Sequence, residues 1–287
     1  MGLLSGKDLS EDIKGRLKKD IEDLKRQGIT PTLGIIRLGE EAGDISYEKG
    51  AVKICTSVDA QVEVSALRRE TSLEKLLLSI QNFNEQDHIH GILIFRPLPK
   101  GLDDNAVRAA LLPSKDMDGI TDSSMAGLYS GTDKGFPPCT AEAAVKLLEY
   151  YNIELSGKNV VVVGRSMVIG KPVSMLLLQK DATVTICHSK TKDLQKKTRE
   201  ADIVIVAMGQ AQALGKEYFR AGQYLIDIGV NAKPNGEKGT CGDLCLNELE
   251  PLVAGISPVP GGVGAVTSAV LVSHLVSAAK LTLTRGQ

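Results

Sequence analysis

The sequence predicts a two-domain α/β protein built on parallel β-sheets. Short apolar runs of strand length alternate with segments in which apolar residues recur at helical spacing. Continuous apolar strands joined by helices are typical of parallel sheets, because the helices then cover both faces of the sheet. The alternation forms two series, separated by a stretch rich in Gly, Pro, Ser and Asp at 112–138. A length of 287 residues suits two domains of ordinary size.

The first series opens with a helix and continues as strands and helices in turn. Helices are expected over 8–26, 45–57 and 72–84, and strands over 30–39, 61–67 and 91–99. Residues 112–138 have no evident helical or strand pattern. We therefore expect an irregular segment there, which links the domains or carries function.

The second series follows this irregular segment. Its first element is expected to be a helix over 140–151 with Thr140 as the N-cap, since a Thr hydroxyl can accept a free N–H of the first turn. Strands are expected over 159–164, 182–188, 201–209 and 224–230. A Gly-rich stretch at 257–267 then precedes a helix from about 267 to 282.

The composition argues against several classes of protein. Lys and Arg number 34 against 35 Asp and Glu, which leaves a net charge of -1 and no basic field for a nucleic acid. The five cysteines are scattered, which favours a reducing cytoplasm over a disulfide framework. Cys241 and Cys245 have no further Cys or His at ligand spacing, so no metal site is expected. No signal peptide is evident, and no apolar stretch is expected to reach the length of a membrane span.

The segment VVVVGRSMVIGKP, at 160–172, predicts a dinucleotide-binding site. A buried strand enters a turn at Gly164, and a helix begins near Gly170. Such a junction directs backbone N–H groups and the positive end of the helix toward a diphosphate. Ser166 stands where the standard motif has its second glycine, and Gly170 comes one residue late. A tight turn of any α/β protein therefore remains an alternative.

Two residues favour NADP over NAD as the cofactor. The strand expected at 182–188 ends about twenty residues after the glycine turn, where an NAD site has a carboxylate for the ribose hydroxyls. Here the chain reads His188, Ser189, Lys190, and Arg165 lies in the glycine turn itself. A guanidinium and a hydroxyl suit a 2′-phosphate, so we expect Arg165 and Ser189 to bind it. The alternative is that both are ordinary surface residues.

Five segments carry motifs that are similar to one family. The most specific are PVPGGVG at 258–264 and GRSMVIGKP at 164–172. The others are LPSKDMDGI at 112–120, GILIFRPLPK at 91–100 and PPCTAE at 137–142. Together, and over nearly the whole chain, they resemble the bifunctional methylenetetrahydrofolate dehydrogenase/cyclohydrolase family.

The resemblance implies a folate cleft between two domains. The N-terminal catalytic domain would comprise residues 1–138 plus 268–287, with the last helix returning to it. The Rossmann-type NADP-binding domain would comprise residues 139–267. Members of the family are commonly homodimers that pair through the NADP domain, so a homodimer is expected here.

The resemblance also implies roles for individual residues. Asp118 would hold the pterin end of the folate, and Tyr47 would stack on the aromatic part of the substrate; both are expected in the catalytic site. Pro260, Gly261 and Gly262 would lie close to the substrate and the nicotinamide, since a glycine permits close approach. From the residues alone, Asp118 is more often a turn former and Tyr47 a packing residue.

Two positions depart from the family pattern. The family has a lysine four residues after the tyrosine and a glutamine that partners this lysine, but this chain has Ala51 and Phe95 there. Lys49 and Lys53 lie two and six residues from Tyr47. Helix geometry predicts that they point away from Tyr47, although a local bulge would change this.

The chemistry indicates which activity these departures affect. Hydride loss from a methylene group between two nitrogens moves no heteroatom proton, so orientation and electrostatics can carry it. Hydrolysis of the methenyl product needs a positioned acid/base group, which Ala51 and Phe95 do not supply. We expect an NADP-dependent 5,10-methylenetetrahydrofolate dehydrogenase of one-carbon metabolism with weak or absent cyclohydrolase activity. The alternatives are a fully bifunctional enzyme, a non-catalytic folate- or NADP-binding homologue, and an NADP dehydrogenase for another small substrate.

Overall fold

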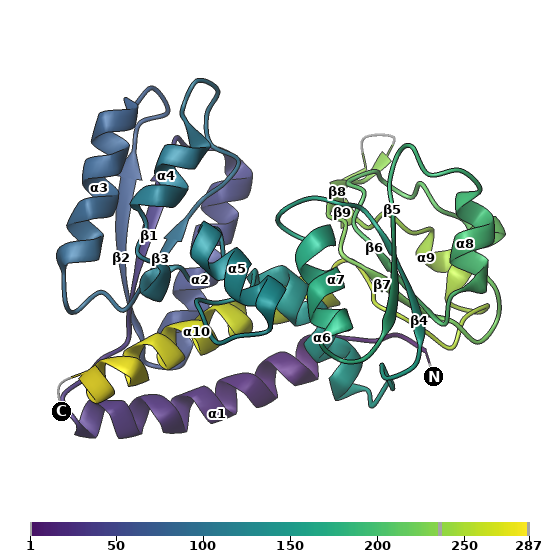
Figure 1. Cartoon of the computed structure of the whole chain (residues 1–287), viewed down its shortest axis with the longest axis horizontal. Coiled ribbons are helices and arrows are strands. Elements are labelled where there is room, and N and C mark those ends of the chain that lie inside the picture. Colours follow the sequence, from purple (N-terminus) through teal and green to yellow (C-terminus); the bar gives the residue numbers. More distant parts are fainter. Residues whose placement is uncertain (1, 235–236, 286–287) are drawn as a thin grey trace. The chain divides into compact units, whose positions relative to one another are not determined.

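Two parallel sheets form the framework of the described chain, which confirms the expected α/β fold (Figure 1). The computed structural model describes residues 2–234 and 237–285. The chain divides into a three-stranded unit, Asp12–Cys139 with Ser268–Gln287, and a five-stranded unit, Met1–Glu11 with Thr140–Thr267. Each unit is described by itself below.

The three-stranded unit has a parallel sheet in the order β2-β1-β3. Its strands are β1 (Thr32–Leu38), β2 (Gln61–Leu67) and β3 (Gly91–Ile94). Its helices are α2 (Ala42–Ser57), α3 (Leu73–Glu85), α4 (Asp104–Ala110), the 3-10 helix η1 (Pro113–Lys115) and α5 (Asp122–Ser130). Helices α1 (Lys7–Arg26) and α10 (Val263–Arg285) contribute most of their residues to this unit.

The core of the three-stranded unit lies around its central strand. Strand β1 is an apolar run apart from Thr32, Gly34 and Arg37, and it is buried along its whole length. Ile36 of β1 packs in one cluster with Leu76 and Ile80 of α3. Each side chain of this size that leaves water contributes about 1.5–3 kcal/mol, so α3 is held on the sheet mainly by its apolar stripe.

The expected irregular segment at 112–138 contains regular structure, so that expectation is wrong in part. Helix α5 begins after Thr121, whose hydroxyl accepts the N–H of Ser124 at 3.2 Å. It ends at Gly131, which adopts a left-handed conformation with φ 67°. The nine residues of α5 have mostly small side chains, and their apolar residues do not recur at helical spacing. The sequence analysis therefore did not predict this helix.

Two further boundaries differ from the expected ones. Helix α6 (Cys139–Tyr150) begins one residue early, so Thr140 lies inside it and is not the N-cap. The N–H of Cys139 instead donates to Oδ1 of Asp118 at 3.0 Å. Strand β3 ends well before residue 99, because Pro97 and Pro99 have no N–H to extend the ladder.

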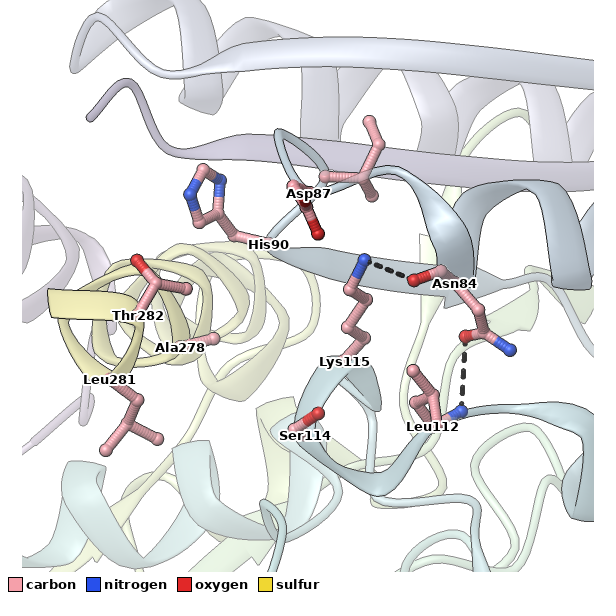
Figure 2. A pocket seen from close by; sticks show the side chains of 10 residues that line it. Asn84, Asp87, His90, Leu112, Ser114, Lys115, Ala278, Leu281 and Thr282 are labelled. Atoms are coloured by element: carbon pink, nitrogen blue, oxygen red, sulfur yellow. Dashed lines mark hydrogen bonds between the residues drawn. The ribbon is translucent and has the colours of Figure 1, made fainter. Parts of the chain in front are cut away.

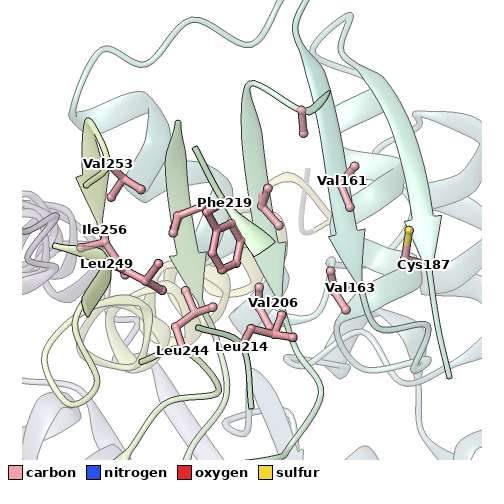
Figure 3. Close-up of a cluster of buried hydrophobic side chains, with 13 residues drawn as sticks. Val161, Val163, Cys187, Val206, Leu214, Phe219, Leu244, Leu249, Val253 and Ile256 are labelled. Atoms are coloured by element: carbon pink, nitrogen blue, oxygen red, sulfur yellow. The ribbon is translucent and has the colours of Figure 1, made fainter. Parts of the chain in front are cut away.

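The five-stranded unit has a parallel sheet in the order β10-β7-β6-β4-β5. The strands are β4 (Asn159–Val163), β5 (Thr183–Cys187), β6 (Ile203–Val206), β7 (Tyr224–Asp227) and β10 (Gly255–Ile256). The other elements are α7 (Gly170–Leu178), α8 (Leu194–Glu200), η2 (Lys216–Tyr218), α9 (Leu246–Leu249) and the hairpin of β8 (Asn231–Ala232) with β9 (Thr240–Cys241). Thirteen buried side chains form a core cluster in this unit, drawn in Figure 3. Val161 and Val163 of β4 and the buried Phe219 belong to it.

Helix α10 corrects another expectation from the sequence. Residues Val263–Leu283 are long and apolar enough to cross a membrane, with mean hydropathy 1.5, and they are the one such stretch in the described residues. Most of this stretch is buried in the protein: Val270, Leu271 and Val272 have no exposed surface. The apolar stretch is therefore longer than the sequence analysis expected. Its burial is that of a core helix.

Candidate functional site

The turn after β4 is built so that only glycine fits at its first position. Gly164 has φ 135°, and a Cβ there would lie 2.4 Å from the carbonyl oxygen of Ala207, which follows β6. Its N–H donates to the carbonyl of Cys187 at 2.9 Å. The order of strands reverses at β4, which has β5 on one side and β6 on the other. Ligands of doubly wound sheets bind beyond the carboxyl ends of the strands at such a reversal.

Ser166 explains why the glycine spacing departs from the standard motif. Its hydroxyl oxygen accepts the N–H groups of Ile169 at 3.1 Å and Gly170 at 3.4 Å, so Ser166 caps the start of α7. A Cβ at Gly170 would lie 2.3 Å from the carbonyl oxygen of Gly164, so the helix packs tightly on the turn. The turn fits a dinucleotide, because the nine-residue helix α7 begins at the strand edge and the glycines at 164 and 170 carry no side chain there.

The structure brings Arg165 and Ser189 to the same edge of the sheet. Val163 of β4 pairs with Cys187 of β5, and Arg165 and Ser189 each lie two residues beyond this pair. Both side chains are exposed. Neighbouring parallel strands are about 4.8 Å apart, so a guanidinium and a hydroxyl at these two places can reach one anionic group.

Asp243 anchors the loop that follows β6, a role that the sequence did not indicate. This carboxylate has no exposed surface and accepts the N–H groups of Met208, Gly209 and Gln210 at 2.6, 3.1 and 2.7 Å. It also accepts the side-chain amide of Asn231 at 2.9 Å. The loop of 208–210 lies beside the glycine turn, because β6 neighbours β4.

A second buried carboxylate, Asp227 at the end of β7, supports Asp243. It accepts the backbone N–H of Asp243 at 3.0 Å and that of Leu244 at 2.8 Å. A Cβ at Gly242 would lie 1.9 Å from Asp227 Oδ2, so the close approach requires glycine. Burial raises the pKa of Asp227 to about 6, against the opposing effect of its N–H partners. The contacts of Gly242 and Asp243 with β7 and with the loop after β6 join residues far apart in the chain, so no local sequence pattern predicted them.

Pro260, Gly261 and Gly262 follow β10 at the edge of the five-stranded sheet. Gly261 has φ 103°, and its carbonyl accepts the N–H of Gly6 at 2.8 Å. A Cβ at Gly262 would lie 2.5 Å from the carbonyl oxygen of Pro258. The two glycines are therefore required by the turn itself, and Pro260 precedes it in a cis peptide bond.

In the three-stranded unit, Tyr47 of α2 contacts Phe95 at the end of β3. The two ring centroids are 5.3 Å apart and the planes are tilted by 45°. Ala51, one turn after Tyr47, has no exposed surface, and Phe95 is 5% exposed. Burial raises the pKa of the Tyr47 hydroxyl well above its usual range, and the charge of Asp118 raises it further. Tyr47 is therefore a neutral phenol at physiological pH, able to donate a hydrogen bond and unable to act as a base.

Asp118 lies near Tyr47, since its charge acts on the pKa of the tyrosine. Burial raises the pKa of the Asp118 carboxyl, whereas hydrogen bonds from Cys139 lower it. Asp116 is different, because both its oxygens are bound within the protein: it accepts the N–H groups of Ile120 and Thr121 at 3.0 and 2.8 Å. Asp116 thus has a structural role, and the structure brings Tyr47, Phe95 and Asp118 together.

The two lysines nearest to Tyr47 in sequence do not share its environment. The side chains of Lys49 and Lys53 are exposed, whereas Tyr47 is half-buried and Ala51 is fully buried. Helix α2 runs from Ala42 to Ser57 without interruption. Neither lysine replaces a lysine at position 51.

In a pocket of about 360 Å³ in the same unit, the side chains of Lys115 and Asn84 are already bound within the protein (Figure 2). Lys115 Nζ donates to the carbonyls of Phe83, Asn84 and Gln86 at 3.1, 2.8 and 2.8 Å, which uses its three protons. The Asn84 side chain is bound to Ala110 and to Leu112. These contacts fix the end of α3 and the residues after α4. In the described part of the chain, no three His, Cys, Asp or Glu side chains are grouped as metal ligands.

Comparison with known families agrees with this geometry. The sequence profile described as tetrahydrofolate dehydrogenase/cyclohydrolase, catalytic domain, matches residues 4–118. The profile of the NAD(P)-binding domain of the same family matches residues 138–283. The chain belongs to the tetrahydrofolate dehydrogenase/cyclohydrolase family. The resemblance drawn from the sequence motifs is thereby confirmed.

Relatives of this family are similar over their full length. The bifunctional protein FolD of Carboxydothermus hydrogenoformans is 44% identical over 278 residues, which cover 97% of each chain. The structure of the bifunctional enzyme FolD from Campylobacter jejuni has a TM-score of 0.95 at 37% identity and covers 98% of this chain and 99% of its own. The FolD of Trypanosoma brucei, solved with NADP cofactor and an inhibitor, has a TM-score of 0.93 at 31% identity and covers 98% of each chain.

Proposed function

We propose that this family member is an NADP-dependent 5,10-methylenetetrahydrofolate dehydrogenase whose cyclohydrolase activity is weak or absent. The observation that supports weak or absent cyclohydrolase activity is the apolar pair at positions 51 and 95. Ala51 is fully buried, and Phe95 lies against Tyr47. No cationic or amide side chain is present at these two positions. The proposal assigns folate to residues 1–138 with 268–287 and NADP to residues 139–267, in a homodimeric enzyme of the cytoplasm.

The glycine turn supports the cofactor half of the proposal. Gly164 and Gly170 leave room for a diphosphate beside the N-terminus of α7. Arg165 and Ser189, exposed at one edge of the sheet, suit the 2′-phosphate that distinguishes NADP from NAD. Bound NADP+ would supply the hydride acceptor.

The residues around Tyr47 support the dehydrogenase half. The Asp118 carboxylate suits the hydrogen-bond donors of a pterin, and the Tyr47 ring offers a face for an aromatic group. The nitrogens beside the methylene carbon stabilise the cation that hydride loss leaves, so no side chain has to move a proton in this step. Positioning and exclusion of water by these groups account for the catalysis.

Hydrolysis of the methenyl cation has different requirements. Water must lose a proton and a ring nitrogen must gain one, and a positioned acid/base group typically accelerates this about 10²–10⁴-fold. The Ala51 methyl group and the Phe95 ring carry no exchangeable proton. The raised pKa of Tyr47 keeps its side chain as the neutral phenol, so no phenolate is present to take the proton from water.

A fully bifunctional enzyme is the second candidate, and one observation favours it. Burial raises the pKa of Asp118 and so favours the protonated carboxyl, which can donate a proton. In that case Asp118 would replace the family's lysine. A non-catalytic binding protein is less well supported, because the glycine turn and the Pro260–Gly262 turn are both preserved.

The proposal is tested by following two products separately. The protein is incubated with methylenetetrahydrofolate and NADP+, and NADPH, the methenyl product and the formyl product are measured in parallel. We expect NADPH and the methenyl compound to rise together, with formyl product forming only at the spontaneous rate of hydrolysis. Rapid replacement of methenyl by formyl product would favour the bifunctional enzyme, and binding without reduction of NADP+ would favour the non-catalytic homologue.

A further inference from the structure

Helix α10 carries one polar ring in the middle of an apolar stretch. His274 is 5% exposed, and Leu271, Val272 and Leu275 around it have no exposed surface. A buried imidazole has to find hydrogen-bond partners, because desolvation without them costs about 1–3 kcal/mol. The hydrogen-bond partner of His274 therefore indicates the role of this residue.

His274 is bound to the backbone of the segment that carries Asp118. Its Nδ1 lies 2.8 Å from the carbonyl oxygen of Met117. A carbonyl only accepts, so Nδ1 must carry the proton and donate. The ring also stacks on Phe136, with centroids 4.7 Å apart and an interplanar angle of 25°, which fixes its orientation.

The same short segment is held by Cys139 at two points. The Cys139 thiol donates to the Met117 carbonyl at 3.1 Å, and its backbone N–H donates to Oδ1 of Asp118 at 3.0 Å. Gly119 follows with φ 62°, and a Cβ there would lie 2.4 Å from the carbonyl oxygen of Phe136. The carbonyl of residue 117 and the carboxylate of residue 118 are thus clamped from α10, from α6 and from the residues before α6.

We propose that His274 is a positioning residue for substrate binding: its Nδ1–H holds the Met117 carbonyl and thereby sets the direction of the Asp118 carboxylate. This inference rests on the proposed role of Asp118 as the carboxylate that binds folate. His274 acts through the backbone and does not touch the substrate. Its loss therefore weakens folate binding while the NADP turn after β4 is unchanged.

Two amide variants distinguish the hydrogen bond from His274 to Met117 from the packing contribution of the side chain. In His274→Asn the side-chain amide can occupy the place of Nδ1 and donate to Met117. In His274→Gln the amide reaches the place of Nε2, so it cannot make this bond. His274→Leu removes every donor at similar volume. Val276→Ala, at a position of α10 that is 2% exposed, is the control for a loss of packing alone.

The experiment measures the dissociation constants of methylenetetrahydrofolate and NADP+ by calorimetry, together with the Tm of each variant. Loss of one hydrogen bond corresponds to about 3- to 10-fold in affinity. We expect this loss for folate in the Gln and Leu variants, near wild-type affinity in the Asn variant, and unchanged NADP+ binding in all. The Val276→Ala control should lower Tm without changing folate affinity.

The outcomes separate this inference from the proposed function. Equal folate affinity in the Asn, Gln and wild-type proteins would overturn the positioning role while leaving the dehydrogenase proposal intact. A parallel loss of folate and NADP+ affinity in the Gln variant would also overturn it, because it would mean general destabilisation. Wild-type protein that binds NADP+ and no folate would overturn the role of Asp118 itself, and the proposed function with it.

Discussion

Asp227 offers a quantitative test of which electrostatic effect dominates in the five-stranded unit. The carboxylate is 3% exposed, and burial together with the nearby Asp243 favours its neutral form. Three backbone N–H groups, those of Gly229, Asp243 and Leu244, favour its charged form. The balance raises its pKa from 3.8 to about 6.

This shift has a definite sign in the dependence of stability on pH. Because the pKa is higher in the folded than in the unfolded state, the folded state binds the proton more tightly. The stabilisation is complete below the unfolded value of 3.8 and is lost as pH rises through about 6. The rise of the Asp227 pKa from 3.8 to about 6 corresponds to about 3 kcal/mol in the free energy of unfolding.

The comparison with Asp227→Asn isolates this contribution, because asparagine does not titrate. Urea unfolding of both proteins, followed by circular dichroism from about pH 4 to about pH 7, gives the difference in stability at each pH. We expect the advantage of the wild-type protein to shrink by about 2.4 kcal/mol over this range, because part of the effect lies below pH 4. The exposed Asp181, changed to Asn, is the control for the loss of one carboxylate from the surface. An advantage that stays constant or grows with pH would mean that the N–H groups outweigh burial, and would refute the reasoning.

Three further predictions concern the turn after β4 and the end of α3. Arg165→Ala should reduce the preference for NADP+ over NAD+ in kcat/KM, and an unchanged ratio in steady-state kinetics would contradict the 2′-phosphate assignment. Gly164→Ala places a Cβ 2.4 Å from the Ala207 carbonyl at φ 135°, so we expect at least a tenfold loss of NADP+ affinity by calorimetry, with folate affinity retained. Lys115→Met removes the donor to three carbonyls and should lower the free energy of unfolding by about 1–3 kcal/mol in urea titrations, whereas turnover by the folded protein should not change.

The features that the sequence predicted are those determined by local pattern. Apolar runs identified the three strands of one sheet and four of the five strands of the other; the two-residue strand β10 was missed. The glycines at 164 and 170 identified the turn after β4. The substitutions at Ala51 and Phe95 were visible because a family motif surrounds each of them.

The features that the sequence did not reveal depend on contacts between distant residues. Asp243 binds N–H groups that are 33 to 35 residues away along the chain. His274 meets Met117 across 157 residues. A single aspartate or histidine in the sequence does not predict which distant residue it binds. Short helices such as α5 were not predicted for a different reason: their ends are determined by capping groups and not by the spacing of apolar residues.

The buried pair at positions 51 and 95 leads to a last prediction about coupling. Ala51→Lys alone would place an ammonium in a fully buried position without an amide partner, and Phe95→Gln alone would leave a cavity and a buried amide. Each single variant should therefore lose about 1–3 kcal/mol of stability, and the double variant should lose less than the sum, because the two side chains satisfy each other. The double variant should also gain hydrolysis of the methenyl compound, measured by loss of its absorbance, while each single variant gains little. Additive losses of stability without any gain of hydrolysis, in a double variant that still binds folate, would show that more than this pair separates the site from a cyclohydrolase.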